Sequence, residues 1–203
     1  MSYKIIKNSA SAEISVKRSK FIANIAPCKT AQEALDFINK ISSLYHDAKH
    51  NCYAFRTITE EKFSDDKEPK GTAGKPIMDV IKHNEIFNCV IVVTRYFGGI
   101  LLGAGGLVHA YSDAALNALN KTETAFLHKA SVFEGEFDYK DLNLIQSLCD
   151  VNEYKIENML YTDKIKANIV IPQEQEELFL NLLEDKSNGN IKFFKIKEDF
   201  CFF

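Results

Sequence analysis

The sequence predicts an α+β protein of two domains, with residues 1–130 in the first and residues 131–203 in the second. In the first part, strand-like segments come before helical ones and do not alternate regularly with them. The second part follows the order βαββαβ, which is typical of a ferredoxin-like split unit of about 70 residues. Charge also differs between the parts: the net charge is +4 over residues 1–131 and −7 over residues 132–203.

The first domain contains a mixture of strands and helices. A helix beginning after Thr30 is predicted because Glu33, three residues later, completes a capping box. Residues 59–74 are polar and rich in turn formers, which predicts a long exposed loop of functional length. The expected strands are residues 3–8, 11–16, 20–27, 50–58 and 88–96, and the expected helices are residues 31–44, 76–84 and 105–120.

The second domain follows from simple periodicity. Leu142, Ile145, Leu148 and Cys149 share one helical face after a strand near residues 131–138. Two strands, 154–161 and 164–171, are joined by Thr162 and Asp163, a connection of hairpin length. Pro172 then begins a helix over residues 173–185, whose first turns carry glutamates that the helix dipole favours. Residues 191–200 alternate as a final strand.

Composition excludes several classes of protein. The chain is 46% hydrophobic and 26% charged, as expected of a chain folded throughout. It lacks an apolar run of the roughly 18 to 20 residues that span a bilayer, and its first residues do not resemble a signal peptide, so we expect a cytoplasmic protein without a membrane partner. Five scattered cysteines without a C-x-x-C pair indicate small core residues, with neither a disulfide framework nor a zinc site.

Five of the nine glycines lie between Gly98 and Gly106, after a strand that ends at Arg95. A strand, a glycine-rich turn and a helix N-terminus can hold an anion with backbone N–H groups. The Walker A and dinucleotide-binding patterns both fail here, so no nucleotide cofactor is expected. Tight turns and close packing explain the glycines equally well.

Arg95 and Tyr96 can be read in two ways. A guanidinium beside aromatic rings suits stacking on bases and pairing with phosphate. A buried structural ion pair with two core aromatic rings is the alternative. The sequence leaves both open.

Polar residues in two blocks provide candidates for other chemistry. Asp47, His50, Asp65 and Asp66 could converge as general acid and base. His46 and His50 have a spacing that can bind a metal, but the glutamate of a metalloprotease motif is missing, so no metal site is expected. Acidic residues in the loop 59–74 could hold magnesium, although a solvated loop is the commoner outcome for such a cluster.

Four blocks together resemble the YigZ/IMPACT family: SKFIA at 19–23, DAKHNCYAFR at 47–56, SDDKEPKGTAGKPI at 64–77, and VVTRYFGGILLGAGGLVHAYSDAAL at 92–116. The resemblance implies a first domain with the fold of ribosomal protein S-five domain two. It also implies a second domain similar to the last domain of elongation factor G. Both folds recur in translation proteins, and eukaryotic members are linked to translational control in amino-acid starvation.

By position, the resemblance also implies a characteristic polar and glycine-rich surface. Its members here are Asp47, His50, Asn51, Arg56, Asp65, Asp66, Glu68, Gly71, Thr72, Gly74, Arg95, Gly98, Gly99, Gly103, Gly105 and Gly106. Family members usually have arginine where this chain has His109. Because imidazole is mostly neutral at neutral pH, this substitution weakens any phosphate site at that position.

The favoured hypothesis is a non-enzymatic, translation-associated regulatory protein that binds RNA or a ribosome-associated partner. The expected nucleic-acid or anion-binding face consists of Arg56, Lys75, Arg95, Tyr96, Gly98, Gly99, Gly103, Gly105, Gly106 and His109. One alternative is an enzyme acting on a small or phosphorylated substrate near the glycine-rich turn. A second is a protein-interaction module without a nucleic-acid role. The sequence does not specify an oligomeric state.

Overall fold

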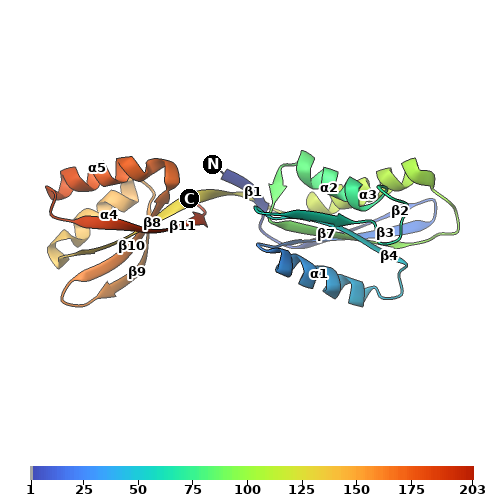
Figure 1. Cartoon of the computed structure of the whole chain (residues 1–203), viewed down its shortest axis with the longest axis horizontal. Coiled ribbons are helices and arrows are strands. Elements are labelled where there is room, and N and C mark those ends of the chain that lie inside the picture. Colours follow the sequence, from blue (N-terminus) through green and yellow to red (C-terminus); the bar gives the residue numbers. More distant parts are fainter. Residues whose placement is uncertain (1) are drawn as a thin grey trace. The chain divides into compact units, whose positions relative to one another are not determined.

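A computed structural model describes residues 2–203, which divide into two compact units (Figure 1). Tyr3–Phe126 form the N-terminal unit, and Leu127–Phe203, together with Ser2, form the C-terminal unit. The strand β8, Thr124–Phe137, runs through the division, so the units are joined without a linker. The predicted α+β architecture with two domains is confirmed.

The N-terminal unit is built on a five-stranded antiparallel sheet with the order β2-β3-β7-β4-β5. The central strand is buried on both faces, which explains why its sequence begins as the unbroken apolar run CVIVV. The strands are β2 (Ala10–Val16), β3 (Ser19–Pro27), β4 (His50–Arg56), β5 (Glu61–Ser64) and β7 (Cys89–Tyr96).

Helices cover both faces of this sheet (Figure 1). The helices α2 (Gly74–His83) and α3 (Gly103–Leu119) pack on one face, and α1 (Ala31–Leu44) packs on the other. Ile91 and Val93 of β7 belong to the core under α2 and α3, whereas Val90 and Val92 belong to the core under α1. Each fully buried side chain of this kind contributes roughly 1.5 to 3 kcal/mol to folding.

Two short strands were absent from the predicted pattern. β5 lies inside residues 59–74, which the sequence predicts as a loop, so that prediction is wrong over Glu61–Ser64. An edge strand pairs on one side only and tolerates charged residues. Its sequence therefore lacks an apolar pattern that would distinguish it from a polar loop. A second short strand, β6 (Ile86–Phe87), pairs in parallel with β1 (Ser2–Ile6).

The C-terminal unit has the predicted βαββαβ order, and its strands pair in the order β11-β8-β10-β9. Ile145, Ile169 and Phe179 are fully buried in the core that the sheet shares with the helices. The elements after β8 are α4 (Leu142–Val151), β9 (Lys155–Tyr161), β10 (Ile165–Pro172), α5 (Glu176–Ser187) and β11 (Lys192–Cys201). Within residues 2–203, none of the helices is long and apolar enough to cross a membrane.

Candidate functional site

The register of the five-stranded sheet brings four connections to one of its ends. Lys20 at the start of β3 is opposite Tyr96 at the end of β7, and His50 at the start of β4 is opposite Arg95. β5 also runs toward this end. We call it the loop end, formed by residues 17–18, 45–49, 65–73 and 97–102. The opposite end, where β4 finishes at Arg56, is called the far end.

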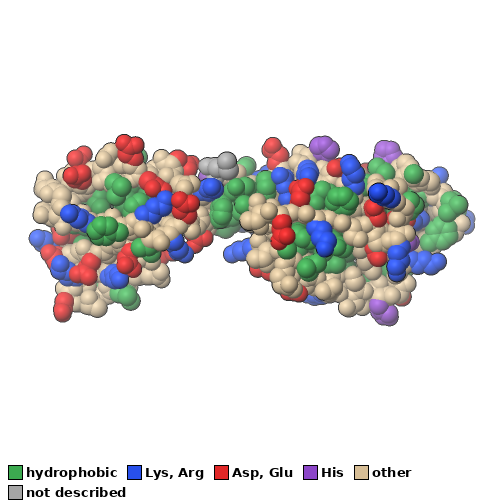
Figure 2. Space-filling model, viewed as in Figure 1, with side chains coloured by type: hydrophobic (Ala, Val, Ile, Leu, Met, Phe, Trp, Pro, Cys, Tyr) green, Lys and Arg blue, Asp and Glu red, His purple; other side chains and the backbone are tan. Residues whose placement is uncertain are grey.

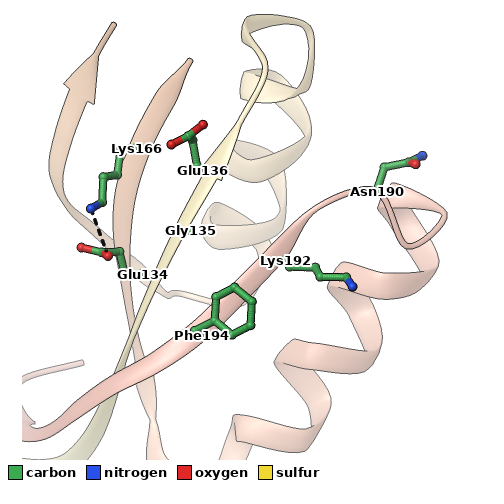
Figure 3. A pocket seen from close by; sticks show the side chains of 7 residues that line it. All are labelled: Glu134, Gly135, Glu136, Lys166, Asn190, Lys192 and Phe194. Atoms are coloured by element: carbon green, nitrogen blue, oxygen red, sulfur yellow. Dashed lines mark ion pairs between the residues drawn. The ribbon is translucent and has the colours of Figure 1, made fainter. Parts of the chain in front are cut away.

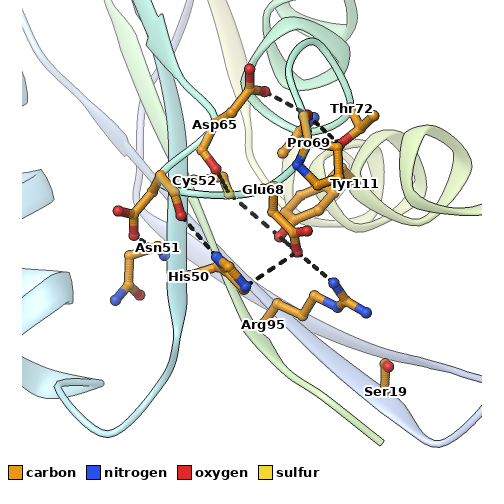
Figure 4. Close-up of polar contacts among 12 residues, drawn as sticks. Ser19, His50, Asn51, Cys52, Asp65, Glu68, Pro69, Thr72, Arg95 and Tyr111 are labelled. Carbon is orange, nitrogen blue, oxygen red and sulfur yellow. Dashed lines mark hydrogen bonds and ion pairs between the residues drawn. The ribbon is translucent and has the colours of Figure 1, made fainter. Parts of the chain in front are cut away.

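Glu68 is the centre of a buried polar network at the loop end (Figure 4). Its Oε1 accepts a hydrogen bond from Arg95 Nη1 at 2.6 Å and another from the Tyr111 hydroxyl at 3.0 Å. His50 Nε2 lies 3.9 Å from the same oxygen. The side chains of Glu68 and Arg95 are only 3% and 7% exposed, so this ion pair is shielded from solvent.

Arg95 is therefore part of the interior. Its guanidinium carbon lies 5.6 Å from the ring centres of both Phe21 and Phe97, and its Nε has no hydrogen-bond partner among the described residues. Of the two readings left open by the sequence, the buried ion pair is the one that the structure shows. The prediction that Arg95 is a surface cation is wrong, because Glu68 neutralises it inside the fold.

The acidic residues of the 65–73 segment bind backbone groups. Asp65 accepts hydrogen bonds from the backbone N–H groups of Gly71, Ala73 and Gly74, at 2.8, 3.1 and 2.9 Å. Ala73 is the N-cap residue of α2, but its side chain has no hydrogen-bond acceptor. Asp65, eight residues earlier in the chain, caps the helix instead. Asp66 Oδ2 accepts the backbone N–H of Asn51 at 2.7 Å, which ties the segment to β4.

Two reactive side chain types lie beneath this segment, but neither is activated. Cys52 Sγ donates to the Asp65 carbonyl at 2.9 Å and lies 3.4 Å from the Tyr111 hydroxyl. Burial raises the pKa of the Cys52 thiol and of the Tyr111 hydroxyl well above their usual ranges. Both groups are protonated at neutral pH and are poor nucleophiles.

The predicted acid–base candidates are held in separate contacts. Asp47 Oδ1 accepts from the Tyr96 hydroxyl at 2.7 Å, and this hydrogen bond raises the pKa of that hydroxyl. His50 Nδ1 donates to the Asp66 carbonyl at 2.8 Å, whereas the Asp65 carboxylate is taken up by the cap of α2. These contacts are those of a scaffold that positions the 65–73 segment.

Thr72 and Asn51 have similar roles. The buried Thr72 hydroxyl donates to the Pro69 carbonyl at 2.7 Å, which closes the turn before α2. Asn51 Oδ1 accepts from the Thr94 hydroxyl at 2.6 Å, which links β4 to β7 through side chains. Both predicted residues lie at the loop end with structural partners.

The glycine-rich connection packs tightly against the β2–β3 turn. A Cβ at Gly98 would lie 2.0 Å from the backbone carbon of Arg18, so only glycine fits there. The Gly98 N–H donates to Ser19 Oγ at 3.2 Å. Gly99 has φ of +83°, a left-handed conformation that favours glycine. The remaining glycines, Gly103, Gly105 and Gly106, lie in the first turn of α3, and His109 is exposed one turn further on.

Two predicted cations do not belong to the Glu68 network. Arg56 is at the far end, where its guanidinium lies 3.8 Å above the Phe87 ring and its Nε is 3.8 Å from Glu61. It is separated from His50 by six residues along β4, or roughly 20 Å. Lys75 lies in the first turn of α2 and forms an exposed pair with Asp79 at 3.0 Å. The predicted continuous face from Arg56 to the glycine-rich turn is therefore wrong, because the strand register places Arg56 at the far end.

The sequence interpretation missed two features of the loop end. Tyr111 completes the Glu68 network from α3, but nothing in its sequence neighbourhood distinguishes it from a core aromatic residue. Lys17 and Arg18 form the two-residue β2–β3 turn with φ of 45° and 68°. The alternation on either side of them was a signal for a hairpin, but the usual Asn-Gly turn sequence is missing.

A hollow lies in the C-terminal unit (Figure 3). Its volume is about 480 Å³, and its walls contain acidic and basic side chains in equal number. Glu134 pairs with Lys166 at 3.1 Å, and Glu136 lies 3.8 Å from Lys164. The lining residues are Glu134, Gly135, Glu136, Lys166, Asn190, Lys192 and Phe194. Within residues 2–203, no three His, Cys, Asp or Glu side chains form a metal-binding group.

Comparison with known families agrees with the two-unit organisation. The Impact N-terminal domain matches residues 17–119, and a domain of unknown function, DUF1949, matches residues 136–190. The first match spans the loop end and both faces of the N-terminal sheet. This chain belongs to the IMPACT family.

Members of the IMPACT family resemble this chain over most of its length. IMPACT family member YvyE of Bacillus subtilis is 32% identical over 192 residues, which cover 93% of this chain and 88% of the relative. IMPACT family member YigZ of Escherichia coli is 31% identical over 90% of this chain and 92% of its own length. A solved structure described as the crystal structure of an hypothetical protein has a TM-score of 0.67 and 30% identity, covering 97% of this chain and 98% of that one.

Proposed function

We propose that this IMPACT family member is a non-enzymatic, translation-associated regulatory protein whose N-terminal unit binds RNA through the loop end. Family membership supports the regulatory role. The binding surface is supported by the charge and backbone conformation of the loop end. The Glu68 network serves as the rigid support beneath that surface.

Unpaired cations surround the loop end. Their side chains are exposed, and none has an ion-pair or hydrogen-bond partner within residues 2–203. They are Lys17, Arg18, Lys49, Lys67 and Lys70. α3 also begins at this end without a side-chain cap or an acidic residue in its first turn, so the positive end of its helix dipole adds to the field. Such a surface attracts a polyanion, and phosphate contacts supply most non-specific affinity for nucleic acids.

The β2–β3 turn is the observation that carries the proposal. Lys17 and Arg18 both adopt left-handed backbone conformations, at a cost of roughly 1 kcal/mol or more each. Asn-Gly would form the same turn with little strain. Lys67, in the 65–73 segment, also has a left-handed φ of 69°. The presence of cations in these left-handed turns, at one end of the sheet, supports a binding role for the loop end.

A turn replacement separates binding from folding. Lys17→Asn combined with Arg18→Gly removes two charges and relieves the left-handed strain, so the variant should unfold at the same or higher urea concentration. We expect its affinity for structured RNA to fall about tenfold at moderate salt. The slope of log affinity against log salt should become shallower by roughly 1.5, as expected for the loss of two phosphate contacts. Filter binding over a salt series measures both quantities.

The matched control is Lys29→Asn combined with Lys62→Asn, which removes the same charge from exposed positions toward the far end. Equal loss of affinity in both double variants would indicate a net-charge effect and contradict the proposed surface. Lack of RNA binding at low salt would contradict the proposal altogether. A pull-down from nuclease-treated lysate tests the alternative of a protein ligand. A partner that is retained after the RNA has been digested would favour that alternative.

A further inference from the structure

The connection from β7 to α3 carries an exposed apolar tip. Phe97, Ile100 and Leu101 are 50%, 42% and 83% exposed, and they lie within the sequence FGGILL. Figure 2 shows hydrophobic side chains at the end of the N-terminal unit where Figure 1 places this connection. Removing such side chains from water would be favourable, but none of the contacts within the unit achieves it.

The tip is held in place at both of its ends. Gly98 is pressed against the Arg18 backbone and donates to Ser19, whereas Leu102 packs against the core of the unit. Gly99, with φ of +83°, turns the chain outward between these anchors. Ile100 and Leu101 therefore project from a defined turn, beside the cations of the β2–β3 turn.

We infer that this tip contacts unpaired bases, so that the preferred ligand is single-stranded or bulged RNA and not a continuous duplex. The inference rests on the proposed RNA binding. An apolar side chain gains no favourable contact from a phosphate group, whereas it can pack on the flat apolar face of an unpaired base. The major groove of an RNA duplex is too deep and narrow for side chains, and its minor groove displays hydroxyl groups. Within RNA, only unpaired nucleotides present apolar base faces and phosphates side by side.

Charge distinguishes this occupant from a second copy of the chain. A two-fold dimer through the tip would place the same patch of each copy against itself. Lys17 and Arg18 of both copies would then approach one another, because Gly98 fixes them beside the tip. An anionic ligand complements these cations. RNA with exposed bases therefore satisfies both the charge and the apolar surface.

Two tip variants test the inference. Leu101→Ala shortens the most exposed apolar side chain, and Phe97→Leu keeps an apolar residue but removes the ring face. Leu116→Ala is the control, because Leu116 is 38% exposed on α3 and lies about 20 Å along the helix from its first turn. Fluorescence anisotropy with a single strand, a bulged hairpin and a duplex of equal length measures the affinities.

We expect the wild-type chain to bind the single strand and the bulged hairpin at least about tenfold more tightly than the duplex. Each tip variant should lose about five- to tenfold of its affinity for unpaired RNA and less than about twofold for the duplex, consistent with stacking on one base. The Leu116 control should match the wild type. 2-Aminopurine at the unpaired position should change its emission with the wild type, and less with Phe97→Leu.

The outcomes separate the two proposals. Equal affinity for duplex and single strand, or tip variants that bind like the wild type, would overturn the inference about unpaired bases. If the Lys17 and Arg18 double variant still weakens binding in that case, the proposed RNA function stands without it. Absence of binding to all three RNAs would overturn both.

Discussion

The two ends of the N-terminal sheet each hold an arginine beside an aromatic ring and a glutamate, but in different surroundings. At the loop end, the Arg95 and Glu68 side chains are 7% and 3% exposed. At the far end, those of Arg56 and Glu61 are 22% and 45% exposed. Similar residues thus form a buried ion pair in one place and a solvated one in the other. The difference shows that burial, and not residue type, decides which pair the fold depends on.

The buried pair also determines what the loop end can do. Glu68 belongs to the 65–73 segment, and its hydrogen bonds with Arg95 of β7 and Tyr111 of α3 hold this segment in position. The exposed cations and the apolar tip are then presented from a fixed support. The far end lacks such a network within the described residues and offers ordinary surface pairs, such as Lys82 with Glu61.

The largest expected effect comes from breaking the buried pair. Glu68→Ala leaves the Arg95 charge buried without its partner, and we expect it to lower the unfolding free energy of the N-terminal unit by about 3 to 5 kcal/mol. Glu61→Ala at the far end should cost less than about 1 kcal/mol. Urea unfolding followed by circular dichroism measures both. Similar costs for the two variants would show that the ends do not differ in this way.

A smaller effect is expected at the contact between the two turns. In Gly98→Ala, the added methyl group would collide with the Arg18 backbone, and we expect a loss of about 1 to 3 kcal/mol. Gly105→Ala serves as the control, because its Cβ would meet nothing within 4 Å in the described part of the chain. Alanine is the better helix former, so this control should gain up to about 1 kcal/mol. Thermal unfolding should show a lower melting temperature for Gly98→Ala and a higher one for Gly105→Ala.

The capping of α2 by Asp65 should contribute less to stability than the contact at Gly98. Asp65→Ala removes the acceptor of three backbone N–H groups, and we expect a loss of about 1 to 2 kcal/mol. Asp79→Ala, which breaks the exposed pair with Lys75, should cost no more than about 0.5 kcal/mol. Amide hydrogen exchange in the first turn of α2 should accelerate only in the Asp65 variant. Unchanged exchange there would contradict the capping role.

Thiol reactivity compares the two ends at the level of single side chains. Burial raises the pKa of Cys52 at the loop end and of Cys89 at the far end well above the usual range. Both should resist alkylation at pH 8 to 9 in the folded protein, whereas the part-exposed Cys201 should react. In Glu68→Ala, Cys52 should become reactive and Cys89 should stay protected, as mass spectrometry after partial labelling can show. Equal exposure of both thiols would indicate unfolding of the whole unit and not opening of the loop end.

Much of the fold was predictable because it depends on local pattern. The helix after Thr30 begins as expected, and the Thr30 hydroxyl accepts the Glu33 N–H at 3.2 Å. The βαββαβ order of the C-terminal unit followed from alternation and helical periodicity. β5 was missed because its edge position imposes little apolar pattern.

The candidate site was predictable in its membership but not in its geometry. His50, Asp65, Glu68 and Arg95 were selected from the sequence, and the structure brings them together. Tyr111 could not be selected, because its contact with Glu68 joins residues that are 43 positions apart.

The sequence by itself determined the two-domain α+β organisation, the central apolar strand and the glycine-rich connection after it, since each follows from periodicity or from the conformational freedom of glycine. Tertiary structure alone decided that Arg95 is an interior residue, that Arg56 lies at the opposite end of the sheet, and that Lys17 and Arg18 lie beside the apolar tip. These relations depend on strand register and burial, which set the neighbours and solvent exposure of each side chain. The same type of charged residue therefore forms a buried ion pair at one position and is exposed to solvent at another.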